Sequence, residues 1–200
     1  DERLVWTGDA QIFIGTAAFN RDVSSFFEKW CEDMEDAQLD DGRIPHVAPN
    51  PFRDEKGNSG GGGGQAAWAD AVVICPWTIY LCYGDKRILE NRYESMKKFV
   101  DWRAKTAVNF IHSEARFGDW LAIDIPDGDC SASPTPKDLI ATAYFARVTE
   151  LLSKIAGILH KSADAKKYAT LFKKIKDAFN NEFVSPAGRI AGDTQASYLL

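Results

Sequence analysis

The first eleven residues of the chain, DERLVWTGDAQ, place two carboxylates and an indole close together: Glu2, Trp6 and Asp9. The flat apolar face of an indole can stack on the C–H face of a pyranose, and carboxylates accept hydrogen bonds from its hydroxyl groups. Glycoside hydrolysis needs a protonated acid at the glycosidic oxygen and, when the configuration inverts, a second carboxylate that activates water. The stretch is therefore either one side of a sugar-cleaving site or the acidic entrance of a helix.

Two later segments repeat this combination of an indole and a carboxylate. Trp68 lies two residues before Asp70, and Asp119 is adjacent to Trp120. The pairs follow or occupy unusually long segments rich in Gly, Pro, Asp and Ser, which we predict to be loops: 40–65 and 112–135. Long loops on a compact scaffold are usually functional or disordered. The alternative is structural, because Trp and Asp also cap helices and fill helical cores.

The composition excludes several classes of partner. The chain has 200 residues, 45% of them hydrophobic, which is long and apolar enough for one domain with a sizeable core. Its formal net charge is −5, and it has no Lys/Arg-rich patch interleaved with aromatic residues, which argues against nucleic acid. No apolar run approaches the roughly 20 residues that cross a bilayer, so we expect no membrane span.

Other chemistries have weaker support in the sequence. The glycine run 60–64 lacks the Lys-Ser/Thr that completes a phosphate-binding loop, and we interpret it as a flexible loop tip or a lid. The four cysteines lack Cys-x-x-Cys spacing, so we expect no metal site, disulfide framework or cofactor. His46, His112 and His160 are isolated in different segments and are expected at the surface or in loops. Two cysteines have apolar neighbours and are expected in the core: Cys31 and Cys75.

Helical periodicity dominates the chain. Apolar residues recur at three- and four-residue steps in segments that we expect to be helices: about 22–37 with Phe26, Phe27 and Trp30 inward, 87–111, 136–160 and 163–183. Pro76 predicts the start of another helix, which ends at Gly84, and Asp9 is a candidate N-cap for the run 10–19. The closing GDTQASYLL is interpreted as the opening turn of a further helix. Strands are limited to possible ribbons at 43–47 and 189–191, and the predicted class is all-α.

The opening stretch resembles the motif Glu-Arg-x-Gly-Trp-x-Gly-Asp-Ala of bacterial α-L-rhamnosidases, glycoside hydrolase family 78. Five more stretches resemble successive blocks of that family's catalytic domain, in the same order: FFEKWCEDMEDAQLDDGRIPHVAP, GQAAWADAVVICPWTIYLCYGD, FGDWLA, TPKDLIATAYF and TQASYLL. The resemblance covers nearly the whole chain. One departure is Val5, which stands where the family commonly has Gly.

This resemblance implies an (α/α)6 barrel, a toroid of six helical hairpins, and an enzyme that releases terminal α-L-rhamnose with inversion. By motif matching, Glu2 is the general acid and Asp9 contacts the sugar and supports the acid. The matched residues that would line the rhamnose pocket are the indoles of Trp6, Trp68 and Trp120, with Asp119 and Asp70 as weaker candidates for accepting hydrogen bonds from its hydroxyls. The expected partner is a rhamnose-containing carbohydrate, and no metal or other cofactor is implied.

The family's upstream sugar-binding Asp and its downstream general base Glu have no match here. Residues 1–200 are therefore expected to be about the first half of the barrel, cut at both ends and inactive alone. Two alternatives stay open. One is another (α/α)6 enzyme, a glucosidase or a polysaccharide lyase, and the other is a non-catalytic sugar-binding helical domain. The sequence indicates no oligomeric state, and a periplasmic or extracellular location would suit the resemblance without any residue that shows it.

Overall fold

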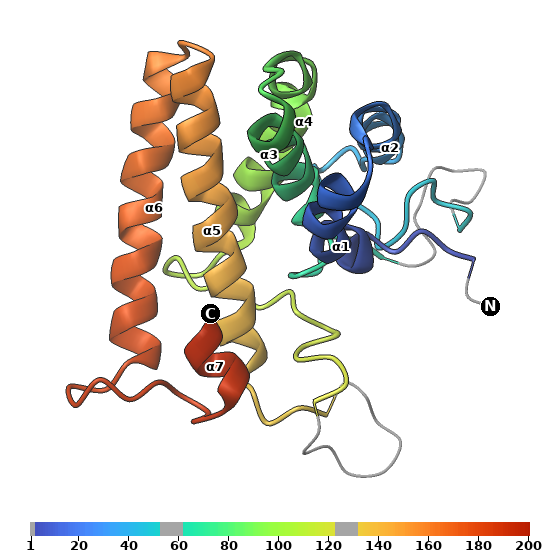
Figure 1. Ribbon diagram of the computed structural model, residues 1–200. Helices are drawn as coiled ribbons and strands as arrows, with labels where there is room; N and C mark the ends of the chain where they lie inside the picture. The colour runs from blue at the N-terminus through green and yellow to red at the C-terminus, as the bar shows by residue number, and fades with distance from the viewer. Residues whose placement is uncertain (1–2, 53–61, 123–131) are drawn as a thin grey trace.

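The computed structural model describes residues 3–52, 62–122 and 132–200. Within these ranges the chain forms seven helices and no strand longer than an isolated bridge (Figure 1). The helices are α1 (Thr7–Asn20), α2 (Ser24–Asp36), α3 (Ala71–Tyr83), α4 (Arg87–Thr106), α5 (Lys137–Ile158), α6 (Ser162–Phe183) and α7 (Gln195–Leu199). The all-α prediction is confirmed. In this described part of the chain, no helix is long and apolar enough to cross a membrane.

Helices α3 and α4 pack against each other, as do α5 and α6, and these antiparallel neighbours are joined by short connections. The pair α5 and α6 runs antiparallel over most of its length (Figure 1). Helix α1 packs on α3 and α3 packs on α5, while α2 packs behind them on α3 and α4. Helices α1, α3 and α5 therefore form one layer, called here the odd-numbered layer. They run in the same direction, so their N-terminal ends and the loops that precede them lie at one end of this layer (Figure 1).

A single large core joins the hairpins. Its buried side chains come mainly from α2, α3, α4 and α5, and those that are completely buried include Met34, Val73, Cys75, Leu89, Met96, Phe99, Val148, Leu152 and Ile155. Helices α5 and α6 begin and end within about two residues of the predicted limits. Their apolar and polar residues recur at helical spacing, which makes the limits visible in the sequence. Helix α3 is apolar on nearly every side, as a helix packed between several neighbours requires.

Two helix starts, one helix end and one core position differ from the prediction. Helix α4 ends at Thr106, before the expected limit at residue 111. Helix α3 begins at Ala71 and contains Pro76, because packing on four neighbouring helices offsets the loss of one backbone donor. Helix α1 begins at Thr7, so Asp9 lies in the first turn and is not the N-cap; an acidic residue is still favourable there, beside free N–H groups. Phe26 is 61% exposed, because the adjacent Phe27 takes the inward position.

The predicted ribbons and glycine loop also differ in detail. The ribbons are reduced to isolated bridges, Trp6 with Val47 and Val184 with Ile190. Gly64 is buried at φ +81°, and a Cβ there would lie 2.3 Å from Cη2 of Trp102. This end of the glycine run is thus packed against α4 and is not a loop tip or a lid, while glycines 60 and 61 lie outside the described residues.

The histidines are more buried than predicted. His46 and His112 lie in loops, but both are almost fully buried, and only His160 is exposed. Burial lowers the pKa of His46 to about 4 and that of His112 to about 3. Both rings are therefore neutral packing elements near pH 7. Cys31 and Cys75 are buried in the core, as predicted.

Candidate active site

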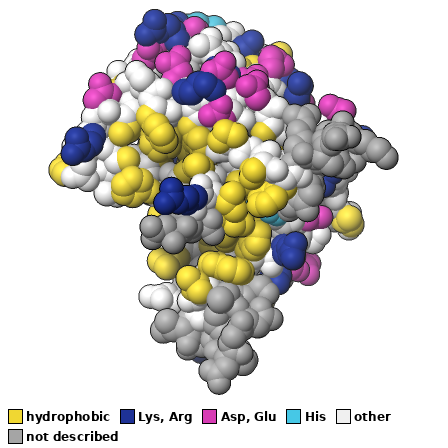
Figure 2. Space-filling model, turned by 90° about the vertical axis from the view of Figure 1, so that its right-hand side faces the viewer, with side chains coloured by type: hydrophobic (Ala, Val, Ile, Leu, Met, Phe, Trp, Pro, Cys, Tyr) yellow, Lys and Arg dark blue, Asp and Glu magenta, His cyan; other side chains and the backbone are white. Residues whose placement is uncertain are grey.

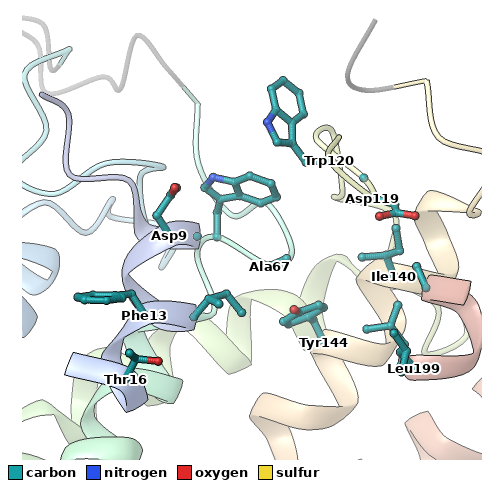
Figure 3. Close-up of a pocket in the computed structure, with 15 residues that line it drawn as sticks. Asp9, Phe13, Thr16, Ala67, Asp119, Trp120, Ile140, Tyr144 and Leu199 are labelled. Carbon is teal, nitrogen blue, oxygen red and sulfur yellow. The ribbon is translucent and has the colours of Figure 1, made fainter. Parts of the chain in front are cut away.

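The N-terminal end of the odd-numbered layer holds a cavity of about 730 Å³ (Figure 3). Helices α1, α5 and α7 supply its walls together with two loops, the one before α3 and the one between α4 and α5. Its polar and aromatic lining residues are Asp9, Phe13, Thr16, Trp68, Asp119, Trp120 and Tyr144. Segments more than one hundred residues apart in the sequence therefore meet around one space.

Phe117 is the centre of an aromatic cluster beside this cavity. Its ring centroid lies 4.5 Å from that of Trp68 and 5.6 Å from that of Trp120. Trp6 meets the same ring edge-on at 6.3 Å, and His46 does so at 4.9 Å. Sequence reasoning did not single out Phe117. The signal available was its place in FGDWLA, directly before the candidate pair Asp119 and Trp120.

Two of the predicted carboxylates lie on opposite sides of the cavity (Figure 3). Asp9 comes from the first turn of α1, and Asp119 comes from the loop between α4 and α5. Two indoles line the same cavity: Trp68 is half-buried and Trp120 is 45% exposed, with their ring centroids 6.5 Å apart and nearly perpendicular. Carboxylate acceptors beside exposed indole faces are suited to binding a hydroxylated ring.

The structure separates the remaining candidates from this group. Trp6 lines two adjoining hollows and reaches the cluster through Phe117. Glu2 lies outside the described residues. Asp70 is fully buried and is not among the lining residues of the cavity. Among the residues that the structure describes, no group of three His, Cys, Asp or Glu side chains could hold a metal ion.

Asp70 forms a buried ion pair with Arg103 of α4. Their Oδ2 and Nη2 atoms are 3.0 Å apart, and both side chains are completely shielded from solvent. The same Oδ2 accepts the backbone N–H of Ala67 at 2.8 Å, and Ala67 has φ +66°. Burial raises the pKa of Asp70, and the charge of Arg103 opposes this change. The pair holds the loop that carries Ala67 and Trp68. Asp70 therefore supports the cavity wall without lining the cavity.

Gly8 allows the indole of Trp68 to lie directly on α1. A Cβ at position 8 would be 2.8 Å from both Cε2 and Nε1 of Trp68, closer than carbon atoms approach in proteins. The side chain of Gln11, one turn further along α1, donates a hydrogen bond to the carbonyl of Ala67. Helix α1 therefore positions the Trp68 loop by close contact and by a hydrogen bond.

Substituting alanine at Gly8 and at Gly15 of the same helix is expected to give effects of opposite sign. Gly8→Ala should lower the free energy of unfolding by about 1–3 kcal/mol, because the new methyl group overlaps the Trp68 ring. An added Cβ at Gly15 meets nothing within 4 Å. Gly15→Ala should therefore raise the free energy of unfolding by about 0.5–1 kcal/mol. Urea unfolding measures both, and two changes of the same sign would contradict the proposed contact.

Helical hairpins with a cavity of indoles and carboxylates at one end are the architecture of six-hairpin glycosidases. The family model described as bacterial alpha-L-rhamnosidase 6 hairpin glycosidase domain matches residues 1–200, and the chain belongs to this family. The predicted family and toroid fold are thereby confirmed.

Relatives of the chain carry the same family name. It is 38% identical over 200 residues to an alpha-L-rhamnosidase of Streptomyces avermitilis and 39% identical over 202 residues to one of Formosa agariphila. The alignments cover 100% of this chain but only 18% and 21% of those proteins. The chain thus spans about a fifth of the length of the curated relatives it matches.

Solved structures have the same fold. The crystal structure of Streptomyces avermitilis alpha-L-rhamnosidase complexed with L-rhamnose superimposes with a TM-score of 0.86 at 36% identity, over 99% of this chain and 18% of that one. Native alpha-L-rhamnosidase from Aspergillus terreus gives a TM-score of 0.84 at 30% identity, over 98% of this chain and 22% of that one.

Proposed function

We propose that the protein containing this chain is an inverting α-L-rhamnosidase, which releases terminal α-L-rhamnose from oligosaccharides, polysaccharides or glycosides. The observation that carries the proposal is the convergence of Asp9, Trp68, Asp119 and Trp120 on one cavity, in a chain 36% identical to a protein solved with L-rhamnose. These residue types match what a small deoxyhexose needs, namely flat apolar walls and anionic acceptors for hydroxyl groups.

In this proposal Glu2 is the general acid. It protonates the glycosidic oxygen as the bond to the anomeric carbon breaks, while water attacks the opposite face of the sugar. The chain reaches Trp6 in a fixed position, because Trp6 pairs with Val47 and the N–H of Thr7 donates to the carbonyl of His46 at 2.8 Å. The same anchoring includes Val5, whose carbonyl accepts the N–H of Ala48 at 3.2 Å.

The sugar contacts are divided among the other candidates. Trp68 and Trp120 provide stacking faces and an apolar wall for the C6 methyl group, and Trp6 supports them through Phe117. Asp9 and Asp119 accept hydrogen bonds from sugar hydroxyls. Asp70, having no exposed surface, contributes by holding the Trp68 loop and does not contact the sugar. No step in this scheme calls for a metal or a cofactor.

We also propose that these 200 residues form the N-terminal part of the catalytic domain and that the general base comes from another part of the protein. Hydrophobic side chains gather on one face of the molecule (Figure 2). On the α1–α2 side, a groove of about 500 Å³ is lined by apolar residues that include Val5, Phe13, Phe26 and Phe27. An apolar surface of this kind supports packing against further hairpins of the same toroid.

Hydrolysis of 4-nitrophenyl α-L-rhamnoside by the complete protein tests the proposed function. We expect release of 4-nitrophenol and of L-rhamnose, with the β anomer appearing first in a proton NMR time course, as inversion requires. The corresponding glucosides should be much poorer substrates. Retention of the α anomer would contradict the inverting mechanism.

The same experiment separates the alternatives. A glucosidase would prefer the glucosides, and a polysaccharide lyase would form unsaturated sugars in place of free rhamnose. Calorimetric binding of L-rhamnose without any turnover would indicate a sugar-binding domain.

A further inference from the structure

Asp119 is held in place by two side-chain hydroxyl groups from the segment just before α5. Its Oδ2 accepts hydrogen bonds from Oγ of Ser133 at 3.2 Å and from Oγ1 of Thr135 at 3.0 Å. Thr135 lies just before α5 and is almost completely buried. None of the described side chains donates to Oδ1. Oδ2 is therefore fixed by hydroxyl groups of the protein, and Oδ1 is the carboxylate oxygen that no described side chain engages.

The hydrogen bonds continue from Thr135 to the N-terminus of α7. Oγ1 of Thr135 lies 2.7 Å from Oγ1 of Thr194, which lies 2.8 Å from Oγ of Ser197. Thr194 is the N-cap of α7, and its Oγ1 also accepts the backbone N–H of Ser197 at 3.2 Å. The chain of hydroxyl groups thus joins the Asp119 loop, the segment before α5 and the first turn of α7.

The carboxylate of Asp119 fixes the direction of every hydrogen bond between these hydroxyl groups. A hydroxyl group has one proton to donate, and an ionised carboxylate can only accept. Thr135 must therefore give its proton to Asp119 and accept one from Thr194. Thr194 in turn accepts from both Ser197 donors, which uses both of its lone pairs. Each hydroxyl group then polarises the next, which strengthens the bond that Asp119 receives.

The contact between the segment before α5 and the first turn of α7 leaves little room for rearrangement. Gly192 has φ +83°, and a Cβ there would lie 2.6 Å from Cδ of Pro136 and 3.1 Å from Oγ of Ser197. Helix α7 also contributes Ala196 and Leu199 to the cavity wall, and Leu200 follows it there. The hydroxyl chain therefore sets both the orientation of Asp119 and the distance between Asp119 and the α7 wall.

We infer that Thr135 and Thr194 are positioning residues for sugar recognition: their hydroxyl groups orient Asp119 so that its Oδ1 accepts a hydrogen bond from one ring hydroxyl of the bound sugar. This inference rests on the proposed function. It assigns to the pair a role in binding and no part in proton transfer to the substrate.

The test compares variants of the complete protein on 4-nitrophenyl α-L-rhamnoside. Thr135→Val keeps the shape of the side chain and removes the donor, and it should lower kcat/KM at least about tenfold, since a hydrogen bond to a charged group is lost. Thr135→Ser restores the hydroxyl and should stay within about threefold of the parent. Thr149→Val is the matched control, because Thr149 is equally buried but donates only to the carbonyl of Phe145, within α5.

Thr194→Asp is a second, independent variant. Aspartate retains an acceptor for the N-cap of α7, but it has no proton to give to Thr135. It should therefore lower kcat/KM at least about tenfold as well. This variant keeps the inference testable if Thr135→Val fails to fold.

Substrates that lack one ring hydroxyl distinguish a positioning role from a merely structural one. One of the 2-, 3- and 4-deoxy rhamnosides should lose at least about tenfold in kcat/KM with the parent and much less with Thr135→Val, because the two changes remove the same interaction. Full additivity for all three substrates would overturn the inference, as would Thr135→Ser being as impaired as Thr135→Val, or Thr194→Asp being fully active. A parent that does not hydrolyse the rhamnoside would instead overturn the proposed function, and the inference with it.

Discussion

Replacing Arg103 by methionine is expected to lower the free energy of unfolding by about 3–5 kcal/mol, because it leaves a buried carboxylate without its counter-charge. Asp70 would keep only the N–H of Ala67 as a donor in a site that is completely shielded from water. The loop of Trp68 would also lose its link to α4, since Arg103 contacts Gly64 O at 3.4 Å as well. Urea unfolding followed by tryptophan fluorescence measures the loss.

Two further variants isolate the buried charge as the cause. Arg87, on the same helix, pairs with Asp85 at the surface, where its side chain is 78% exposed. Arg87→Met should therefore change the free energy of unfolding by less than about 1 kcal/mol. Combining Arg103→Met with Asp70→Asn removes both charges and should recover part of the loss. Equal effects of Arg103→Met and Arg87→Met would show that the buried pair does not stabilise the loop.

Replacing Glu2 by glutamine in the complete protein is expected to lower kcat on an alkyl α-L-rhamnoside by about 100-fold or more, because the amide cannot donate the proton that the leaving oxygen needs. The loss should be much smaller on a 2,4-dinitrophenyl rhamnoside, whose leaving group departs as a stable anion. The binding of L-rhamnose should change little, since the proton is needed in the transition state.

The dependence on the leaving group separates an acid from a binding residue. Asp119→Asn serves as the comparison, because Asp119 lines the cavity and is proposed only to accept a hydrogen bond from a sugar hydroxyl. Its loss of activity should be similar for both leaving groups. If Glu2→Gln hydrolyses the alkyl rhamnoside within a few fold of the parent, Glu2 is not the general acid.

The elements predicted well were those with a local, periodic signal. Helices α5 and α6 have one apolar and one polar face, so spacing alone located them. Helix α3 gave no such signal, because it is apolar on nearly every side, and Pro76 then marked a false start. The adjacent Phe26 and Phe27 could not be ranked by spacing, and only packing decides that Phe27 points inward.

The sequence indicated which residue types line the candidate site, but it did not indicate how they are arranged. The pairs of indoles and carboxylates drew attention to Trp68, Trp120, Asp9 and Asp119, which the structure brings together. No local pattern shows that Asp70 faces Arg103, 33 residues away on another helix. The hydroxyl chain from Asp119 to Thr194 is hidden for the same reason, since it joins segments that meet only in the folded protein.

The common direction of α1, α3 and α5 affects the charge balance of the proposed reaction. Each helix N-terminus has a partial positive charge of about half an elementary charge, from aligned peptide dipoles. An oxocarbenium-like transition state is itself cationic and is disfavoured by these ends. Asp9 and Asp119, on opposite sides of the cavity, supply negative charge that offsets this field. In the proposed reaction, these two carboxylates would therefore offset the helix ends as well as bind the sugar.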